Sequence, residues 1–194
     1  MVTYVAFLRG INVGGNNLLK MDALRAEFST AGFQSVTTYI QSGNVIFQSE
    51  IPSKVAVEAK IEKMLSVRFK YKAKVLIRSR QDMGNIVAHF PKIFSDPKWK
   101  HNVILLSRAI DSKSILKKLE IKKDIEELSY YKGALFWSAK MDKITRSNMI
   151  KLSARPEYQE MTVRNVNTTR KMLELMREPG HFGSAPFDWA QGEQ

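Results

Sequence analysis

Apolar residues follow two different periods in the first eighty residues, and their alternation predicts a mixed α+β fold. Residues 2–9 form a largely apolar run typical of a buried strand, whereas Met21, Leu24, Phe28 and Ala31 recur at the spacing of one helix face. The predicted elements are strand 2–9, helix 21–31, strands 36–41 and 44–48, helix 54–65 and strand 73–78. This order, βαββαβ, is the split βαβ unit of ferredoxin-like folds.

The same order of periods recurs in the second half of the chain. Ser79, with Asp82 three residues later, predicts a capping box at the start of a linking helix that ends at Pro91. The elements predicted beyond it are strand 102–107, a helix capped by Asp111, a hairpin over 128–138 that turns near Lys132-Gly133, helix 145–152, strand 161–164 and a helix after Thr168. We therefore predict an α+β protein of two tandem ferredoxin-like βαββαβ subdomains with a linking helix. The predicted boundaries are 1–79 for the first subdomain, 80–100 for the linking helix and loop, 101–178 for the second subdomain and 179–194 for a C-terminal tail.

Three segments that contain no carboxylate, 8–17, 39–45 and 162–171, are rich in Gly, Asn, Ser, Thr and Arg. In a βαββαβ unit the first and second strands run parallel, so the loop after the first strand and the hairpin after the second emerge at the same edge of the sheet. Backbone N–H groups in such loops suit phosphate or carboxylate. Alternatively, the glycines only provide the positive φ of tight turns. The predicted ligand-binding residues are Arg9, Asn12, Gly14, Gly15, Gln41, Ser42, Gly43, Asn44, Arg164, Asn165, Asn167, Thr168 and Arg170.

The third of these segments suggests an anion site at the start of a helix. If Asn167 or Thr168 caps the last helix, Arg170 and Lys171 lie in its first turn, where the helix dipole disfavours cations. An anion bound there would compensate this conflict, and Arg164 has the geometry to hold it bidentately. The alternative is that these cations contact carboxylates or water, and we favour it for Lys171.

Positive charge is concentrated in the middle of the chain. The formal net charge is +12, and residues 51–150 carry 22 Lys and Arg against 10 Asp and Glu, whereas the other residues carry 9 of each sign. Such an excess attracts polyanions such as nucleic acid, and it also serves solubility. The three polar segments lie in the neutral parts of the chain, so a joint site requires that the fold bring them to the basic middle.

Several classes of chemistry are excluded or disfavoured by composition. The chain has no cysteine, so it has no disulfide, thiolate metal site or cysteine nucleophile. Its three histidines are isolated, and we predict no metal site, no cofactor and no identifiable catalytic residue. No apolar run has the length of a membrane span and the start lacks a signal-peptide pattern, so we predict a cytoplasmic protein without membrane contact.

Five strings give the chain a family resemblance. LRGINVGG at 8–15, MDALR at 21–25, GF at 32–33, TYIQSGNVIF at 38–47 and TVRNVNTTRK at 162–171 resemble, in the same order, the bacterial family called domain of unknown function 1697. The resemblance implies a fold of two ferredoxin-like α+β subdomains, and it implies no activity.

The sequence favours a binding or regulatory protein over an enzyme. Its expected ligand is phosphate-bearing, either a small molecule or nucleic acid, held between the two subdomains. The alternative is a transferase-type enzyme that acts on a small phosphorylated or nucleotide substrate, with Arg9, Arg164 and Arg170 as electrostatic stabilisers. A third possibility is that the polar loops only lock the two halves together.

Overall fold

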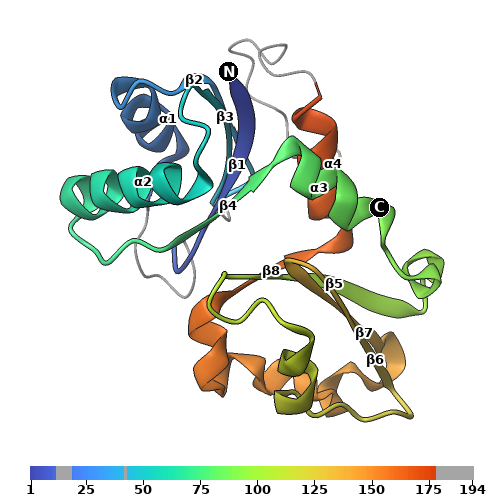
Figure 1. Ribbon diagram of the computed structural model, residues 1–194. Helices are drawn as coiled ribbons and strands as arrows, with labels where there is room; N and C mark the ends of the chain where they lie inside the picture. Colours follow the sequence, from blue (N-terminus) through green and yellow to red (C-terminus); the bar gives the residue numbers. More distant parts are fainter. Residues whose placement is uncertain (12–18, 42, 178–194) are drawn as a thin grey trace.

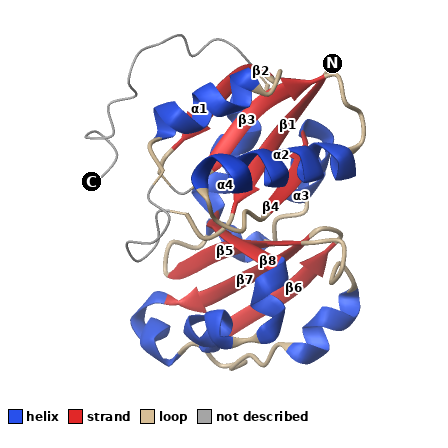
Figure 2. Cartoon of the chain, turned by 90° about the vertical axis from the view of Figure 1, so that its left-hand side faces the viewer, coloured by secondary structure: helices blue, strands red, loops and turns tan. Residues whose placement is uncertain are grey.

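The computed structural model describes residues 1–11, 19–41 and 43–177 of the chain (Figure 1). The strands are β1 (Val2–Leu8), β2 (Gln34–Tyr39), β3 (Asn44–Ser49), β4 (Val75–Ser79), β5 (Trp99–Leu106), β6 (Glu126–Tyr131), β7 (Ala134–Lys140) and β8 (Met161–Asn165). They form two antiparallel sheets of four strands, in the orders β2-β3-β1-β4 and β6-β7-β5-β8. The protein is therefore α+β with two sheet subdomains, and Figure 2 shows one sheet above the other.

Two helices, α1 (Met21–Thr30) and α2 (Lys54–Phe69), complete the first half of the molecule. Their apolar faces and one face of the first sheet form a common core, which includes Phe28, Ile61 and Phe47. Ser53 caps α2 as predicted, because its side chain accepts a hydrogen bond from the Ala56 N–H (3.3 Å). The capping signal at Ser53 therefore places the start of α2 correctly.

The second half contains short 3-10 helices where α-helices were predicted. Ser147 has an extended backbone (φ −65°, ψ 140°), so the helix expected over 145–152 is divided there into two segments. The helix expected after Asp111 is also 3-10, and it is capped by Ser112. The five segments are η1 (Lys92–Ser95), η2 (Lys113–Lys118), η3 (Met141–Arg146), η4 (Asn148–Ala154) and η5 (Pro156–Glu160).

Helices α3 (Arg80–Ala88) and α4 (Val166–Leu175) lie together between the two sheets (Figure 1). The capping box predicted at Ser79 and Asp82 is present at the start of α3. One hydrophobic cluster joins both helices to a face of each sheet, and it includes Val5, Phe7, Met83, Val103, Phe136 and Met172. The predicted linking helix is thus a component of a core that the two halves share.

The two sheets have the same strand register. Phe7 pairs with Asn44 on one side and Leu76 on the other, and Leu105 pairs with Ala134 and Thr162 in the same way. Arg78 pairs with Val5 in the first sheet, and Arg164 pairs with Val103 at the equivalent position of the second sheet. The residue after each arginine caps the following helix, so α3 corresponds to α4.

Candidate functional site

Arg164 joins the two halves of the molecule. Its guanidinium donates hydrogen bonds from Nε to Asn44 Oδ1 (2.7 Å), from Nη2 to the Leu8 carbonyl (3.2 Å) and from Nη1 to the Val163 carbonyl (2.8 Å). It also lies over the Phe7 ring, 5.5 Å from the centroid. Burial lowers the pKa of Arg164 to about 10, so the side chain remains charged at neutral pH. Arg164 therefore connects β8 to the ends of β1 and β3.

Arg9 makes a second connection between the halves. Its Nη2 donates to the Tyr158 carbonyl (2.7 Å), and its guanidinium lies 5.7 Å from the centroid of the Tyr158 ring. Burial lowers the pKa of Arg9, and the nearby charges of Tyr158 and Glu160 oppose that shift. Two of the predicted ligand-binding arginines thus contact the protein itself, as the locking hypothesis expects.

Gly43 and Asn44 are packed against the end of β1. Gly43 has a φ of 74°, and a Cβ built on it would lie 2.8 Å from both Leu8 Cβ and Ile11 Cδ1, so any other residue would clash. Its carbonyl accepts from the Leu8 N–H (2.8 Å). The buried Asn44 side chain donates to the Tyr39 carbonyl (3.1 Å) and accepts from Arg164. The positive φ of Gly43 agrees with the alternative that the glycines serve tight turns, whereas the sequence pattern did not specify the structural role of Asn44.

The helix start in the third polar segment differs from the prediction. Asn165, not Asn167 or Thr168, is the N-cap of α4, and its Oδ1 accepts from the Thr168 N–H (2.7 Å). Arg170 and Lys171 therefore lie beyond the first turn, and the conflict with the helix dipole does not arise. Arg170 is exposed, with its guanidinium 5.5 Å from the centroid of the Phe90 ring.

The remaining predicted site residues are distributed as follows. Gln41 and Asn167 are exposed, whereas Thr168 is buried at the start of α4. The structure thus gathers Gly43, Asn44 and Arg164 at one junction of the sheets and leaves Arg170 on an exposed helix face. Asn12, Gly14, Gly15 and Ser42 lie outside the described residues.

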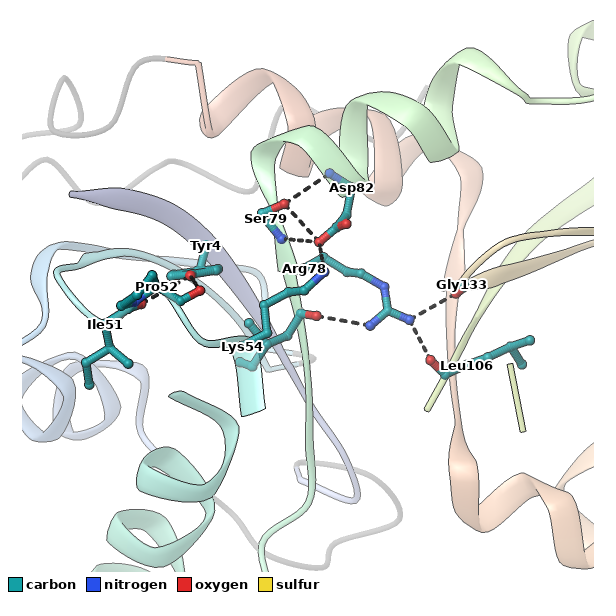
Figure 3. A network of polar contacts seen from close by, with 10 residues as sticks. Tyr4, Ile51, Pro52, Lys54, Arg78, Ser79, Asp82, Leu106 and Gly133 are labelled. Carbon is teal, nitrogen blue, oxygen red and sulfur yellow. Dashed lines mark hydrogen bonds and ion pairs between the residues drawn. The ribbon is translucent and has the colours of Figure 1, made fainter. Parts of the chain in front are cut away.

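Arg78, which sequence reasoning missed, is the counterpart of Arg164 in the other half. Its Nη2 donates to the carbonyls of Leu106 (2.5 Å) and Gly133 (3.0 Å), as Figure 3 shows. Its Nη1 donates to the carbonyl of Ile77 (3.0 Å). The contacts are reciprocal, since each arginine extends from the last strand of one sheet to the central strand and hairpin of the other. A signal for Arg78 was present in the sequence. In both β4 and β8, an arginine is the fourth residue of the strand, and the next residue caps a helix.

A cleft of about 460 Å³ opens beside Arg78, between the two halves. It is lined by parts of α2, β4 and α3 from the first half, and by the residues after β5 and the β6–β7 turn from the second. Its four cations are Lys54, Arg78, Arg108 and Lys132, and its three carboxylates are Glu58, Asp82 and Asp111. All of them come from the basic middle of the chain, and none was among the predicted site residues.

The carboxylates of the cleft are engaged by the protein. Asp82 closes the α3 capping box and binds Lys54 Nζ (2.8 Å), and Asp111 accepts from the Tyr130 hydroxyl (2.9 Å) and the Gly133 N–H (2.7 Å). Burial works to raise the pKa of Asp82, but hydrogen bonds from Lys54 and Ser79 outweigh it and lower that pKa below its ordinary value. Asp82 therefore remains ionised at neutral pH, and the hydrogen bonds of both acids hold the walls of the cleft.

Glu58 is the exception among the three acids. Burial raises its pKa, with Glu62 adding to the effect, while Arg108, whose Nη2 lies 3.9 Å from Glu58 Oε2, opposes it. A carboxyl group with a raised pKa inside a cleft has the properties of a proton donor or acceptor.

Arg78 differs from Lys54 and Arg108, which form ion pairs with Asp82 and Glu58, in how its charge is balanced. Burial lowers its pKa, and Asp82, Asp111 and Glu58 oppose this from a distance. Within the described ranges, Arg78 forms no ion pair with a carboxylate, and its Nη1 and Nη2 atoms donate to backbone carbonyls. Arg78 therefore lines the cleft without a direct carboxylate partner among the described residues.

Neither a three-residue metal-binding cluster nor a membrane-spanning helix is present among the described residues. No group of three or more His, Asp or Glu side chains there is arranged to hold a metal ion. None of the helices described combines the length and the apolarity needed to cross a bilayer.

Comparisons with known proteins agree with this architecture. The chain is similar to a solved structure of a conserved bacterial protein from Streptococcus pneumoniae, with 28% sequence identity, a TM-score of 0.80 and coverage of 90% of this chain and 98% of that one. No curated protein matches it. The model of a family described as protein of unknown function (DUF1697) matches residues 1–137, which include the first sheet, α3 and most of the second sheet. The chain therefore belongs to the DUF1697 family.

Proposed function

We propose that this protein binds a small phosphate-bearing ligand in the cleft beside Arg78. The observation that carries the proposal is the Arg78 guanidinium, a cation whose hydrogen bonds within the described residues all go to backbone carbonyls, at the junction of the two halves. Arginine binds phosphate with strong, charge-assisted hydrogen bonds. Arg108 and Lys132 lie around the same cleft and add positive charge.

The size of the cleft supports a small molecule over a nucleic acid strand. Its volume of about 460 Å³ falls within the range of small-molecule sites, which is about 300–1,000 Å³. Strand binding uses a groove that follows the backbone over several nucleotides. We therefore expect binding that weakens only modestly with salt, since few phosphates are neutralised.

This proposal moves the ligand away from the residues that the sequence singled out. Arg9 and Arg164 already donate to Tyr158, Leu8 and Asn44. Their hydrogen bonds support a role in joining the two halves, whereas Arg108 and Lys132 are exposed at the cleft.

Calorimetric titration of the purified full chain with ribose 5-phosphate and inorganic phosphate tests the proposal. We expect Arg108→Ala with Lys132→Ala to weaken binding by about tenfold or more, since a charge-assisted hydrogen bond contributes about 1.5–3 kcal/mol. Arg146→Ala is the matched control, because Arg146 is an exposed arginine outside the cleft. Equal affinities of all three proteins would refute the cleft, and a loss confined to Arg170→Ala would place the ligand at α4.

A second candidate function is a transferase-type enzyme that acts on a phosphorylated or nucleotide substrate in the same cleft. Glu58 favours this candidate, because burial raises the pKa of its carboxyl group although Arg108 lies 3.9 Å away and opposes the shift. Glu58 would then exchange a proton with the substrate, and Arg78 and Arg108 would stabilise developing charge. In that case Glu58→Gln would abolish turnover while preserving the affinity for the phosphorylated substrate.

We also propose that both halves are versions of the ferredoxin-like unit. The first half supports this with its element order, its strand order β2-β3-β1-β4 and two helices on one face. The second half keeps the strand order and replaces the helices by 3-10 segments.

A further inference from the structure

The cleft beside Arg78 contains an aromatic platform as well as cations. Tyr131, at the end of β6, lines the cleft, and one face of its ring is stacked on His89, with ring centroids 3.9 Å apart and planes 22° apart. This stacking fixes the ring from the side of α3. A ring held in this way loses little freedom when a second ring is added to it.

Apolar and amide groups accompany this ring. Leu76, Ile86 and Leu106 are buried residues of the cleft wall. Asn85, which is exposed on α3 and also lines the cleft, makes no side-chain hydrogen bond with the described residues. An amide offers both donors and an acceptor, so it matches the polar edge of a nucleobase.

The corresponding position in the first half shows which of these features belong to the cleft. Tyr39 pairs with Asn44 at the end of β2, as Tyr131 pairs with Ala134 at the end of β6. Tyr39 also packs against the shared core, but it lines no part of this cleft. Tyr39 and Tyr131 therefore occupy equivalent positions, but of the two only Tyr131 lines the cleft.

We propose that the ligand of the cleft is a mononucleotide. Its phosphate contacts Arg78, Arg108 and Lys132, its base lies against Tyr131, and Asn85 binds the edge of the base. The inference rests on the proposed function and adds the ring to it. A longer strand is the competing ligand, and its binding would fall steeply with salt.

The test compares nucleotides with a phosphate that lacks a base. We titrate the full chain calorimetrically with AMP, GMP, CMP and UMP, and with ribose 5-phosphate. At least one nucleotide is expected to bind about tenfold more tightly or better than ribose 5-phosphate, because stacking on an aromatic side chain is worth that much per base. Tyr131→Leu is expected to abolish this advantage and to leave the affinity for ribose 5-phosphate within about twofold. Tyr39→Leu is the matched control and keeps the advantage.

The outcomes separate this inference from the proposed function. If ribose 5-phosphate and the nucleotides bind equally to the unaltered protein, the nucleotide inference fails while phosphate binding stands. If neither binds, both fail. An oligonucleotide that binds more tightly than any mononucleotide, with a steep salt dependence, overturns the inference in favour of a strand.

A measurement on the unaltered protein covers the case in which Tyr131→Leu does not fold. In NMR spectra, the base protons of the bound nucleotide are expected to move upfield because of the aromatic ring beneath them, and the Asn85 side-chain amide signals are expected to shift. Base protons that keep their free positions on binding would refute stacking on Tyr131.

Discussion

At the scale of single residues, the buried Tyr4 and the partly buried Tyr71 illustrate how the surroundings determine what a hydroxyl contributes. The Tyr4 hydroxyl donates to the carbonyls of Ile51 (3.1 Å) and Pro52 (2.8 Å), which ties β1 to the start of α2. The Tyr71 hydroxyl is buried and has no hydrogen-bond partner among the described residues. Burial raises the pKa of Tyr71 to about 12. One hydroxyl therefore stabilises the fold, and the other costs desolvation energy.

The contrast predicts opposite effects for two identical substitutions. Tyr4→Phe should lower the free energy of unfolding by about 1 kcal/mol, because two carbonyls lose their donor. Tyr71→Phe should leave it unchanged or raise it, because it removes an unpaired buried group. Urea unfolding at pH 7 checks both, and a clear loss of stability in Tyr71→Phe would show that its hydroxyl is paired.

The raised pKa of Tyr71 also predicts a pH dependence. The folded state disfavours ionisation of this phenol, so its contribution is complete below pH 10, the ordinary pKa, and declines as the pH rises toward about 12. Tyr71→Phe lacks this decline, so the stability of the unaltered protein should fall relative to that of the variant between pH 9 and 11. A constant difference across this range would contradict the assignment.

At the scale of elements, a single buried carboxylate holds the irregular part of the second half. Glu126, at the start of β6, accepts hydrogen bonds from the N–H groups of Lys122 (2.7 Å) and Met149 (3.1 Å) and from Trp137 Nε1 (3.2 Å). It also accepts from the hydroxyl of Ser147, the residue that divides η3 from η4. The bond from the Met149 N–H satisfies a backbone donor in the first turn of η4, where a helix has no internal acceptor.

Replacement of this carboxylate should therefore loosen the 3-10 segments. We expect Glu126→Gln to destabilise the protein by about 2–4 kcal/mol, because the amide nitrogen cannot accept and leaves buried donors unpaired. Glu127→Gln is the matched control at the exposed neighbouring position and should change stability by less than about 0.5 kcal/mol. Thermal unfolding followed by circular dichroism compares them, and equal effects would refute the anchoring role.

At the scale of the whole molecule, the two halves are joined by a shared core and by reciprocal arginines. Arg78 and Arg164 occupy matching positions, and each donates to carbonyls of its own strand and of the opposite half. Loss of either arginine leaves buried acceptors unpaired at a junction where α3 and α4 also pack. The molecule should therefore unfold as one cooperative unit.

This cooperativity can be measured with two probes. Two of the three tryptophans, Trp99 and Trp137, belong to the second half, so fluorescence of a Trp189→Phe variant reports on that half, and circular dichroism reports on all helices and sheets. We expect the two denaturant transitions to coincide. Arg164→Leu should lower the free energy of unfolding obtained from either probe by about 2–4 kcal/mol. The exposed Arg146→Leu serves as the control. Separate transitions for the two probes would show that the halves fold independently.

The sequence alone determined the features that depend on residues close together in the chain, namely the strands, most of the α-helices, a helix cap and a turn. The apolar periods predicted the strands and the helices α1 to α4, and the capping box at Ser79 and the turn at Lys132-Gly133 are present as predicted. The family was also recognisable, because its motifs are contiguous strings. The α-helices predicted after Asp111 and over 145–152 were wrong, because both regions form 3-10 segments. For the second of them, apolar spacing does not reveal that Ser147, which bonds to Glu126, divides the chain.

Only the tertiary structure decided how the polar groups are used. Arg164 meets Asn44 and Leu8 across 120 and 156 residues of sequence, and Arg78 meets Gly133 across 55. The cleft beside Arg78 is likewise assembled from residues 54 to 133, which no single motif contains. The sequence shows which polar groups are present. Whether a guanidinium makes structural hydrogen bonds or lines a cleft depends on which residues the fold places around it.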